Sequence, residues 1–516
     1  MVYLSENRPV RMITLCALYV AQGIPWGFVT VTFAAWLAQP GSGLTTEQLG
    51  PILGVASLPW SFKFLWGPIT DRFSFGRFGR RRPWILFAQG TGILLLTAIA
   101  LADDPASMVW KSAPADSPLW AAVYHIVPGP LAALILLANV FISLQDVAVD
   151  ALAVDTLQEH ERGLANGLMY GSSYLGTAIG GAGLGWITAS YGLRAGLFGQ
   201  ALLLAAIMLL PLFTRERREP SEEDASGLPG TGGTSVDAGA HSERLGGHLG
   251  HREHSGHTVI PDFGETPFAP PESFSLTESS LNSEPQADRF VSDAKSPESV
   301  QVGESAESAS VWRNLRHAFL VPSAMIGVVV ALLVKVGIGT LSAVFVTYLL
   351  QHAGWTQAEY TQVNGGLAVG LGLLGSVAGG FIADRIGAQR VIVSASFCLM
   401  LLWCSFGCVP DSLQSKLPVT ALLMTQELLL ATLSVALFSL FMSISHPIVA
   451  ATQFTAYMAL MNLSTTCGSY LAALLTPHLT VYSILVIAGL LQATVSLPVL
   501  WIRLPNRTDR HRREPV

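Results

Sequence analysis

Twelve long apolar stretches constrain the fold of this 516-residue chain more strongly than any motif in it. A transmembrane helix needs about 20 mostly apolar residues to cross the hydrocarbon core of a bilayer. Only 12% of the residues are charged, against about a quarter in soluble proteins. We therefore predict an all-α polytopic membrane protein with 12 transmembrane helices in two six-helix halves. The predicted spans are 11–38, 47–70, 83–102, 128–154, 163–189, 193–213, 319–350, 357–383, 389–409, 417–445, 452–476 and 479–503.

A polar segment separates the sixth and seventh spans. Its sequence includes "EPSEEDASGLPGTGGTSVDAGA", a composition that buries too little apolar surface to fold. We predict an N-terminal bundle (1–213), a disordered cytoplasmic linker (214–317) and a C-terminal bundle with a basic tail (318–516). The linker contains four histidines at three-residue spacing, but no folded frame would position them, so a solvated tract is favoured over a metal site. No metal or cofactor is predicted. These histidines are His248, His251, His254 and His257.

The positive charges of the short loops predict the orientation. Lys and Arg are enriched in cytoplasmic loops of membrane proteins. If both termini are cytoplasmic, the opposite side carries only Lys111, Arg194 and Lys416. We therefore predict a multi-pass protein of the cell (inner) membrane with both termini in the cytoplasm.

The predicted fourth span contains acidic residues in "LQDVAVDALAVD" (144–155). Asp146 and Asp150 are four residues apart and share one helical face, whereas Asp155 falls on the opposite face and is expected to meet water or the following loop. Ionisable groups deep in a membrane commonly mark substrate or proton pathways. Lys63 in the second span has the depth of Asp146, and a pair between them is either a static tie or a proton-linked switch.

Other polar residues lie at mid-depth in the predicted spans. Lys335 and Glu427, in the seventh and tenth spans, either form a buried structural pair or face a common cavity that binds substrate and exchanges protons. Gln22 lies beside a glycine and a proline, which either open the first helix to a ligand or simply kink it. For Trp26 we expect either stacking on a sugar ring of the substrate or packing at a bend of the helix. The glycines of "GTAIGGAGLGW" (176–186) predict close helix packing.

A loop pattern occurs twice, once in each half. "GPITDRFSFGRFGRRRPW" (67–84) follows the second span and "GGFIADRIGAQRVI" (379–392) follows the eighth. The pattern resembles the loop signature of the major facilitator superfamily, whose fold has two duplicated halves. The resemblance implies a conformational latch at the cytoplasmic ends of these helices. Ordinary loop charges would give the same pattern. The latch candidates are Asp71, Arg72, Arg80, Arg81, Asp384 and Arg385.

Three stretches resemble the AmpG-like muropeptide permeases and the related acetyl-coenzyme A transporters. They are "LPWSFKFLWGPITDRF" (58–73), "QDVAVDALAVDTLQEHERGLANGL" (145–168) and "ATQFTAYMALMNLS" (451–464). The resemblance implies a secondary active transporter, a proton-coupled symporter that imports a sugar-containing, anhydromuropeptide-like cell-wall fragment by alternating access. A small-molecule substrate, protons as the coupling ion and a monomer are expected.

Other classes of function stay open at this point. The loop "FGRRRPW" also resembles glycoside-cation symporters, so a cation-coupled sugar symporter is one alternative, and an acyl-CoA carrier is another. A membrane enzyme or a receptor belongs to a different class. We expect no enzyme, because the sequence shows no catalytic His or metal constellation at one membrane face. Nucleic-acid binding has no support in the sequence.

Overall fold

The structure is a computed structural model that describes most of both predicted halves. Of the predicted linker it describes only 214–216 and 317, so the disorder predicted there and the histidine tract lie outside the described residues. The described ranges are 2–42, 44–73, 75, 78–110, 112, 123–158, 161–216, 317–409, 411–446 and 449–502.

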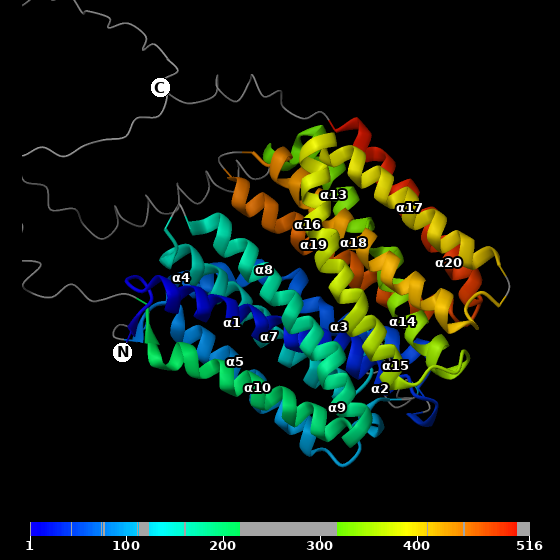
Figure 1. Cartoon of the computed structure of the whole chain (residues 1–516), viewed down its shortest axis with the longest axis horizontal. Helices are drawn as coiled ribbons and strands as arrows, with labels where there is room; N and C mark the ends of the chain where they lie inside the picture. Colours follow the sequence, from blue (N-terminus) through cyan, green and yellow to red (C-terminus); the bar gives the residue numbers. More distant parts are fainter. Residues whose placement is uncertain are drawn as a thin grey trace, which may run out of the picture. The chain divides into compact units, whose positions relative to one another are not determined.

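The N-terminal half is a bundle of helices, drawn in blue to green (Figure 1). Asn7 caps the first helix by accepting a hydrogen bond from the Val10 N–H, which satisfies one of the unpaired donors of a helix start. The α-helices are α1 (Arg8–Gly27), α2 (Ala34–Leu37), α3 (Thr46–Ser61), α4 (Trp66–Arg72), α5 (Arg82–Leu101), α7 (Pro130–Thr156), α8 (Arg162–Ala178), α9 (Leu184–Tyr191) and α10 (Leu193–Phe213). Short 3₁₀ and π turns join them: η1 (Phe28–Phe33), η2 (Pro40–Ser42), η3 (Lys63–Leu65), η5 (Pro105–Met108) and η7 (Ile179–Gly183).

The C-terminal half is a second bundle with the same order of long helices. Thr356 and Glu359 form a capping box at the start of α15, a common signature of a helix N-terminus. The elements are α13 (Pro322–Leu333), α14 (Val336–Gln351), α15 (Gln357–Gln362), η8 (Val363–Leu367), α16 (Ala368–Ile386), α17 (Ala388–Cys408), α18 (Lys416–Ile444), α19 (Ala450–Leu475), α20 (Val481–Ser496) and η10 (Leu497–Trp501).

Ten helices of the described residues are long and apolar enough to cross a membrane. They account for ten of the twelve predicted spans. The predicted second span is interrupted at Phe62 and continues through η3 into α4. The predicted fifth span runs through α8, η7 and α9, a segment rich in glycine. Both spans are therefore present as helical segments, but neither is a single regular apolar α-helix.

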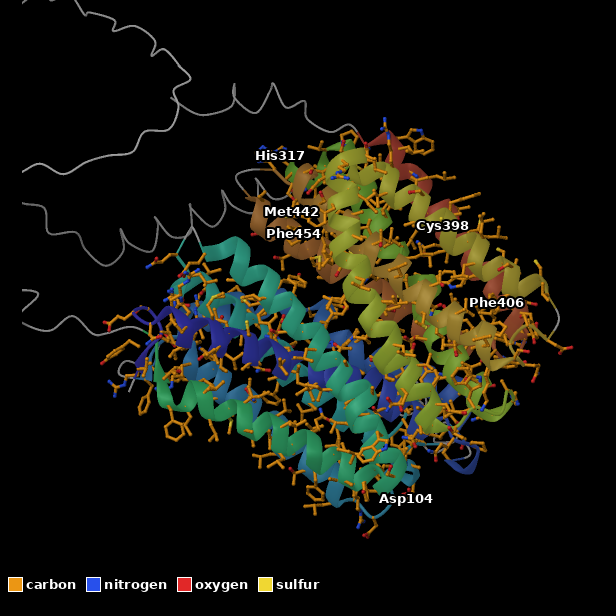
Figure 2. All side chains as sticks on the ribbon, viewed as in Figure 1. Asp104, His317, Cys398, Phe406, Met442 and Phe454 are labelled. Carbon is orange, nitrogen blue, oxygen red and sulfur yellow. The ribbon has the colours of Figure 1, made fainter. Side chains whose placement is uncertain are left out.

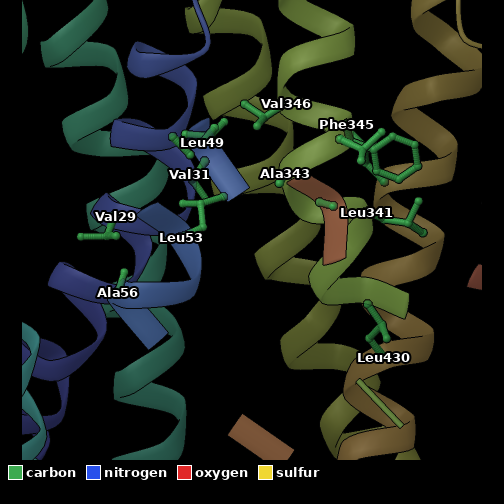
Figure 3. Close-up of a cluster of buried hydrophobic side chains, with 14 of the residues drawn as sticks. Val29, Val31, Leu49, Leu53, Ala56, Leu341, Ala343, Phe345, Val346 and Leu430 are labelled. Atoms are coloured by element: carbon green, nitrogen blue, oxygen red, sulfur yellow. The ribbon is translucent and has the colours of Figure 1, made fainter. Parts of the chain in front are cut away.

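The apolar core extends across both halves. Figure 3 shows residues of α3, such as Leu49 and Ala56, in the same buried cluster as Leu341 and Phe345 of α14. Helix α3 also packs along α19. Within the N-terminal half, a Cβ at Gly176 or Gly180 of the predicted packing glycines would collide with backbone of α1. The prediction that the glycines of this segment serve close helix packing is confirmed for Gly176 and Gly180.

We call the end of the bundle where α1 begins and α10 ends the terminal face, and the other end the far face. At the terminal face, the strands β1 (Val2–Tyr3) and β2 (Thr214–Arg215) pair in parallel. Glu216 then accepts hydrogen bonds from the backbone N–H groups of Arg80 and Arg81 at 2.9 and 2.7 Å. A carboxylate at this position favours the start of α5 because helix N-termini are positive. The described part of the N-terminal half ends at Glu216, which these hydrogen bonds hold at the start of α5.

Candidate functional site

A cavity of about 940 Å³ lies between the two halves. Its walls come from α1, α7 and α8 on one side, and from α16, α18 and α19 together with the α13–α14 junction on the other. The lining includes Leu157 at the end of α7, Asp384 in the last turn of α16 and Met442 near the end of α18. The cavity therefore extends to the terminal face. Its polar lining residues are Tyr19, Asp150, Tyr170, Tyr174, Lys335, Ser376, Asp384, Ser434 and Ser439.

Uncharged polar contacts join the two halves at the far face. The side-chain amide of Gln39 donates a hydrogen bond to that of Gln357. Gln351 donates to the carbonyl oxygens of Ala38 and Leu44 at 3.0 and 2.9 Å. These bonds connect the segment after α2 with α14 and α15, so the cavity is closed towards the far face.

Glycines allow the halves to touch just inside these bonds. The π-helical turns η7 and η8 pack against each other, and a Cβ on Gly181 would lie 2.8 Å from the Cα of Gly365. No larger residue fits this approach without movement of the backbone. Short π-helical insertions are frequent at functional sites, and here η1, η7 and η8 meet at the closed end of the cavity.

A charged cluster lies on the N-terminal side of the cavity. The Lys63 Nζ is 2.9 Å from the Asp146 Oδ2, and both side chains are mostly buried. One turn closer to the terminal face, Asp150 accepts a hydrogen bond from the Tyr19 hydroxyl of α1. The structure thus brings together Lys63 and Asp146, as the sequence suggested, and places Asp150 on the same face of α7. Asp155 instead binds Arg81 at 2.9 Å, so the expectation that it meets only water or the next loop was incomplete.

The predicted pair of the C-terminal half has a different geometry. Lys335 is the residue before α14, where its N–H donates to the Ser464 Oγ at 3.0 Å, and its side chain lines the cavity. Glu427 of α18 packs against Gly372 of α16 and lies near the Tyr174 ring. The charges of Lys335 and Glu427 interact, but no ion pair joins them in the described part of the chain.

Gln22 and Trp26 follow Tyr19 along α1, in the direction of the far face. Trp26 packs edge to face on Trp60, with ring centroids 6.1 Å apart, and the Lys63 Nζ is 5.9 Å from the Trp60 ring. Gln22 is buried, and its amide nitrogen has no hydrogen-bond partner among the described residues. Neither residue lines the cavity in this conformation.

The predicted latch residues lie at the terminal face but do not bridge the halves here. Asp71 binds Arg80 and Arg81 at 3.2 and 2.6 Å, within the N-terminal half. Burial opposes the charge of Arg81, but its hydrogen bonds to Asp155 and Asp71 outweigh this and raise the pKa of Arg81. Asp384 lines the cavity mouth, while Arg72 and Arg385 are exposed. Among the described residues, no ion pair connects a latch residue of one half with the other half.

A second ionic group ties the first and fifth spans of the N-terminal half together. Arg11 is 2% exposed; its guanidinium donates to the Glu161 Oε2 at 2.6 Å and to the carbonyl oxygen of Leu4 at 2.7 Å. Arg8 binds the other carboxylate oxygen at 3.0 Å. Burial opposes the charge of Glu161, but the hydrogen bond and positive charge of Arg11 outweigh it and hold the pKa of Glu161 below its usual range.

Three tyrosines of the cavity were missed from the sequence. Tyr19 of α1 and Tyr170 and Tyr174 of α8 line the cavity; Tyr19 and Tyr170 lie near the charged groups of the N-terminal half, and Tyr174 lies near Glu427. Tyr170 and Tyr174 are four residues apart in "MYGSSY", which places them on one helical face. That spacing in a glycine-rich span was the available signal. Among the described residues, no group of His, Cys, Asp and Glu is suited to hold a metal ion.

The helix order, the two similar bundles and the cavity between them define a polytopic membrane protein built around a central site. A family model described as Major Facilitator Superfamily matches residues 15–457. The chain belongs to the major facilitator superfamily. This confirms the fold class predicted from the apolar stretches and the repeated loops.

Curated relatives agree with the closer resemblance. The anhydromuropeptide permease of Escherichia coli (strain K12) is 29% identical over 233 residues, which are 44% of this chain and 41% of that protein. The putative transporter AmpG 4 of Rickettsia felis is 24% identical over 176 residues, 34% of this chain and 37% of that protein. The matches cover less than half of the length of these relatives. Their names are those of transporters, in agreement with the prediction of no enzyme.

Solved structures show the same fold over nearly the whole chain. The D-xylose-proton symporter has a TM-score of 0.59 at 12% identity, covering 96% of this chain and 98% of its own. The nucleoside transporter NupG has a TM-score of 0.55 at 10% identity, covering 95% and 98%. At such identity the likeness shows the fold alone.

Proposed function

We propose that the protein is a secondary active transporter that imports a sugar-containing cell-wall fragment, similar to an anhydromuropeptide, together with protons. The observation that carries this proposal is the cavity between the halves, which reaches the terminal face and is closed at the far face. A site open to one side only is one of the two states that alternating access requires. The other state would close the terminal face and open the far face.

The charge distribution supports a cytoplasmic terminal face. Described arginines gather there, whereas the described far face carries Arg194 and Lys416. This asymmetry follows the positive-inside rule. In this orientation the structure corresponds to an inward-open carrier, and both termini of the chain are cytoplasmic.

The substrate class rests on the relatives and on the character of the cavity. One relative is named an anhydromuropeptide permease. Three tyrosines and several serines line the cavity beside apolar side chains such as Phe438 and Phe454. Sugar rings present hydroxyl groups and apolar C–H faces, so a wall of this kind suits them. Figure 2 labels Met442 and Phe454 at the end of the C-terminal half nearest α8.

Proton coupling is assigned to the carboxyl groups around the cavity. Asp150 lines the cavity and is bound by Tyr19, while Asp146 holds Lys63 and Glu427 lies behind Gly372. A carrier couples to protons when a carboxyl group binds a proton in one facing state and releases it in the other. Protonation of Asp146 would release Lys63, and protonation of Asp150 would change its bond with Tyr19.

Uptake into proteoliposomes tests the proposal. The purified protein would be offered a labelled anhydromuropeptide, neutral disaccharides and acyl-CoAs, with and without an inwardly directed proton gradient. We expect accumulation of the muropeptide that an uncoupler abolishes. Accumulation of a disaccharide or an acyl-CoA instead would show that the proposed substrate class is wrong. Binding without net flux would indicate a receptor.

The coupling residues have their own test in the same assay. Asp146→Asn and Glu427→Gln are expected to abolish accumulation driven by the proton gradient while substrate exchange continues, because an amide cannot release a proton. Asp150→Asn should give an intermediate defect. Normal gradient-driven accumulation in all three variants would reject proton coupling through these groups.

A further inference from the structure

Each half has a lysine at a break in a helix, in the second span of the N-terminal half and in the first span of the C-terminal half. Lys63 follows the end of α3, and Lys335 follows the end of α13. Their partners differ. The Lys63 Nζ binds Asp146 at 2.9 Å, whereas Lys335 forms no ion pair in the described part of the chain. The break at Lys335 is fixed through its backbone, which donates to Ser464, so its side chain is left to line the cavity.

The acidic groups around the cavity do not supply the missing partner. Glu427 affects Lys335 through its charge, but its carboxylate packs against Gly372 and Tyr174 rather than against the ammonium. Asp150 faces the cavity from the N-terminal half and is bound by Tyr19. An ammonium group at membrane depth is unfavourable unless it is paired or in contact with water or a ligand. The three donors of Lys335 are therefore available to a ligand.

An apolar stripe leads from Lys335 to the cavity mouth. Ala431, Val435, Phe438 and Met442 lie on one face of α18 and line the cavity. Lys335 lies 13 residues from the start of α13 at Pro322, and Ala431 lies 13 residues from the end of α18 at Ile444. Both are therefore about 20 Å from the terminal face at 1.5 Å per residue. The stripe runs from the depth of Lys335 to the mouth.

We infer that Lys335 is a specificity-determining residue that receives an anionic group of the substrate, while the apolar stripe of α18 takes the body of the same molecule. The inference rests on the proposed transport function and adds that the substrate enters the site with its anionic end innermost. A carboxylate or a phosphate ester fits the ammonium equally well, since each offers several acceptors to its donors.

Matched substrate pairs test this inference. The first pair is the anhydromuramyl disaccharide with a free lactyl carboxylate and the same disaccharide as its primary amide. The second pair is N-acetylglucosamine 6-phosphate and N-acetylglucosamine. Competition for binding is measured on the purified full chain. We expect wild type to prefer the anionic member of one pair by about 10- to 100-fold, as for a hydrogen bond to a charged group. Lys335→Gln should lose this preference, and Lys335→Arg should keep most of it.

The preference is a ratio within one variant, so it does not depend on how much of that variant folds. Lys416→Met is the matched control, because this lysine lies on the far face and binds Glu359; it should keep the wild-type ratio. Equal binding of both members of both pairs by wild type would overturn the inference, as would an unchanged ratio in Lys335→Gln. A preference that depends on Lys335 but occurs only for N-acetylglucosamine 6-phosphate over N-acetylglucosamine would support the inference. It would also reject an anhydromuropeptide as the substrate in the proposed function.

Discussion

The Lys63–Asp146 pair shows how a single contact admits two roles. The Lys63 side chain is 20% exposed and that of Asp146 is 11% exposed, so each charge depends on the other for compensation. Removing one partner of a buried pair leaves an uncompensated charge, whereas removing both often costs little. A variant that replaces both residues therefore separates the two roles: it should still transport if the pair is a static tie, and lose proton-driven transport if the pair is a switch.

For this pair we predict that Asp146→Asn lowers the free energy of unfolding by about 3 kcal/mol. The double variant Lys63→Met, Asp146→Leu should recover most of that loss. A double-mutant cycle of Lys63→Met, Asp146→Leu and the variant with both, measured by thermal unfolding in detergent, gives the coupling. If the pair also moves protons, the double variant will fold but will not accumulate substrate along a proton gradient. Full gradient-driven accumulation by the double variant would make the pair a static tie.

Glu161 gives a prediction about pH. Its pKa is lower in the folded protein than in an unfolded chain, so it stabilises the fold above its unfolded pKa of about 4.3. That contribution is lost as the pH falls through the lower folded value. We expect Glu161→Gln to lower the midpoint of thermal unfolding at pH 7. The difference from wild type should shrink as the pH falls below about 4.

Arg8→Gln is the matched control for Glu161, because the Arg8 side chain is 56% exposed and exposed ion pairs contribute little. It should change the midpoint much less than Glu161→Gln does. A difference between Glu161→Gln and wild type that stays the same at every pH would contradict the role given to the ionised carboxylate.

Helix breaks position the charged groups of the cavity. Phe62, just before Lys63, has φ −117° and ψ 9°, and Lys335 has φ −105° and ψ 4°. Both residues leave the helical region for a sparsely allowed conformation that is frequent at active sites. Pro59 precedes the first break and cannot donate a backbone hydrogen bond. Each break turns a lysine from a regular helix towards the interior of the protein.

The glycine contact between η7 and η8 gives a prediction about the closed end. A Cβ on Gly181 would lie 2.8 Å from the Cα of Gly365, and overpacking of this kind costs about 1–3 kcal/mol. Gly181→Ala should therefore shift the carrier towards states that are open at the far face. We expect a cysteine placed at the buried Thr347, in a background without native cysteines, to react with an impermeant maleimide about 5- to 100-fold faster.

Gly183→Ala is the control for this experiment, because a Cβ there meets nothing within 4 Å. It should leave the labelling rate of the cysteine at position 347 unchanged. Equal labelling rates in Gly181→Ala and wild type would show that the glycine contact does not hold the far face closed.

Across the whole molecule, the two faces of the bundle differ in the residues they carry. Amide hydrogen bonds and a glycine contact join the halves at the far face. Asp71, Arg81 and other charged residues occupy the terminal face, where the cavity opens. Rocking of one half against the other would break the first set and bring the second set together. Extensive packing of α3 on α19 supplies a contact on which such rocking can turn.

The contact between the halves leads to a prediction about the linker. The described helices of both halves form one compact unit with many contacts of their own, and the composition of the predicted linker offers little apolar surface. Deleting 225–305 should leave the midpoint of thermal unfolding and the rate of substrate uptake close to those of wild type. Loss of both membrane insertion and uptake would show that the linker takes part in folding.

The helix count, the duplicated halves and the close packing of glycines followed from the sequence, because each depends on local apolar length or on residue spacing within one helix. The equal depth of Lys63 and Asp146 also followed from helical rise. The Arg81 partner of Asp155 did not follow, since Arg81 approaches from another segment. The lack of an ion pair between Lys335 and Glu427 did not follow either, since Glu427 packs against Gly372. The closure of the far face did not follow from the sequence, because the hydrogen bonds of Gln39 and Gln351 join residues about 300 positions apart. Such contacts depend on how two complete bundles meet, which no local pattern encodes.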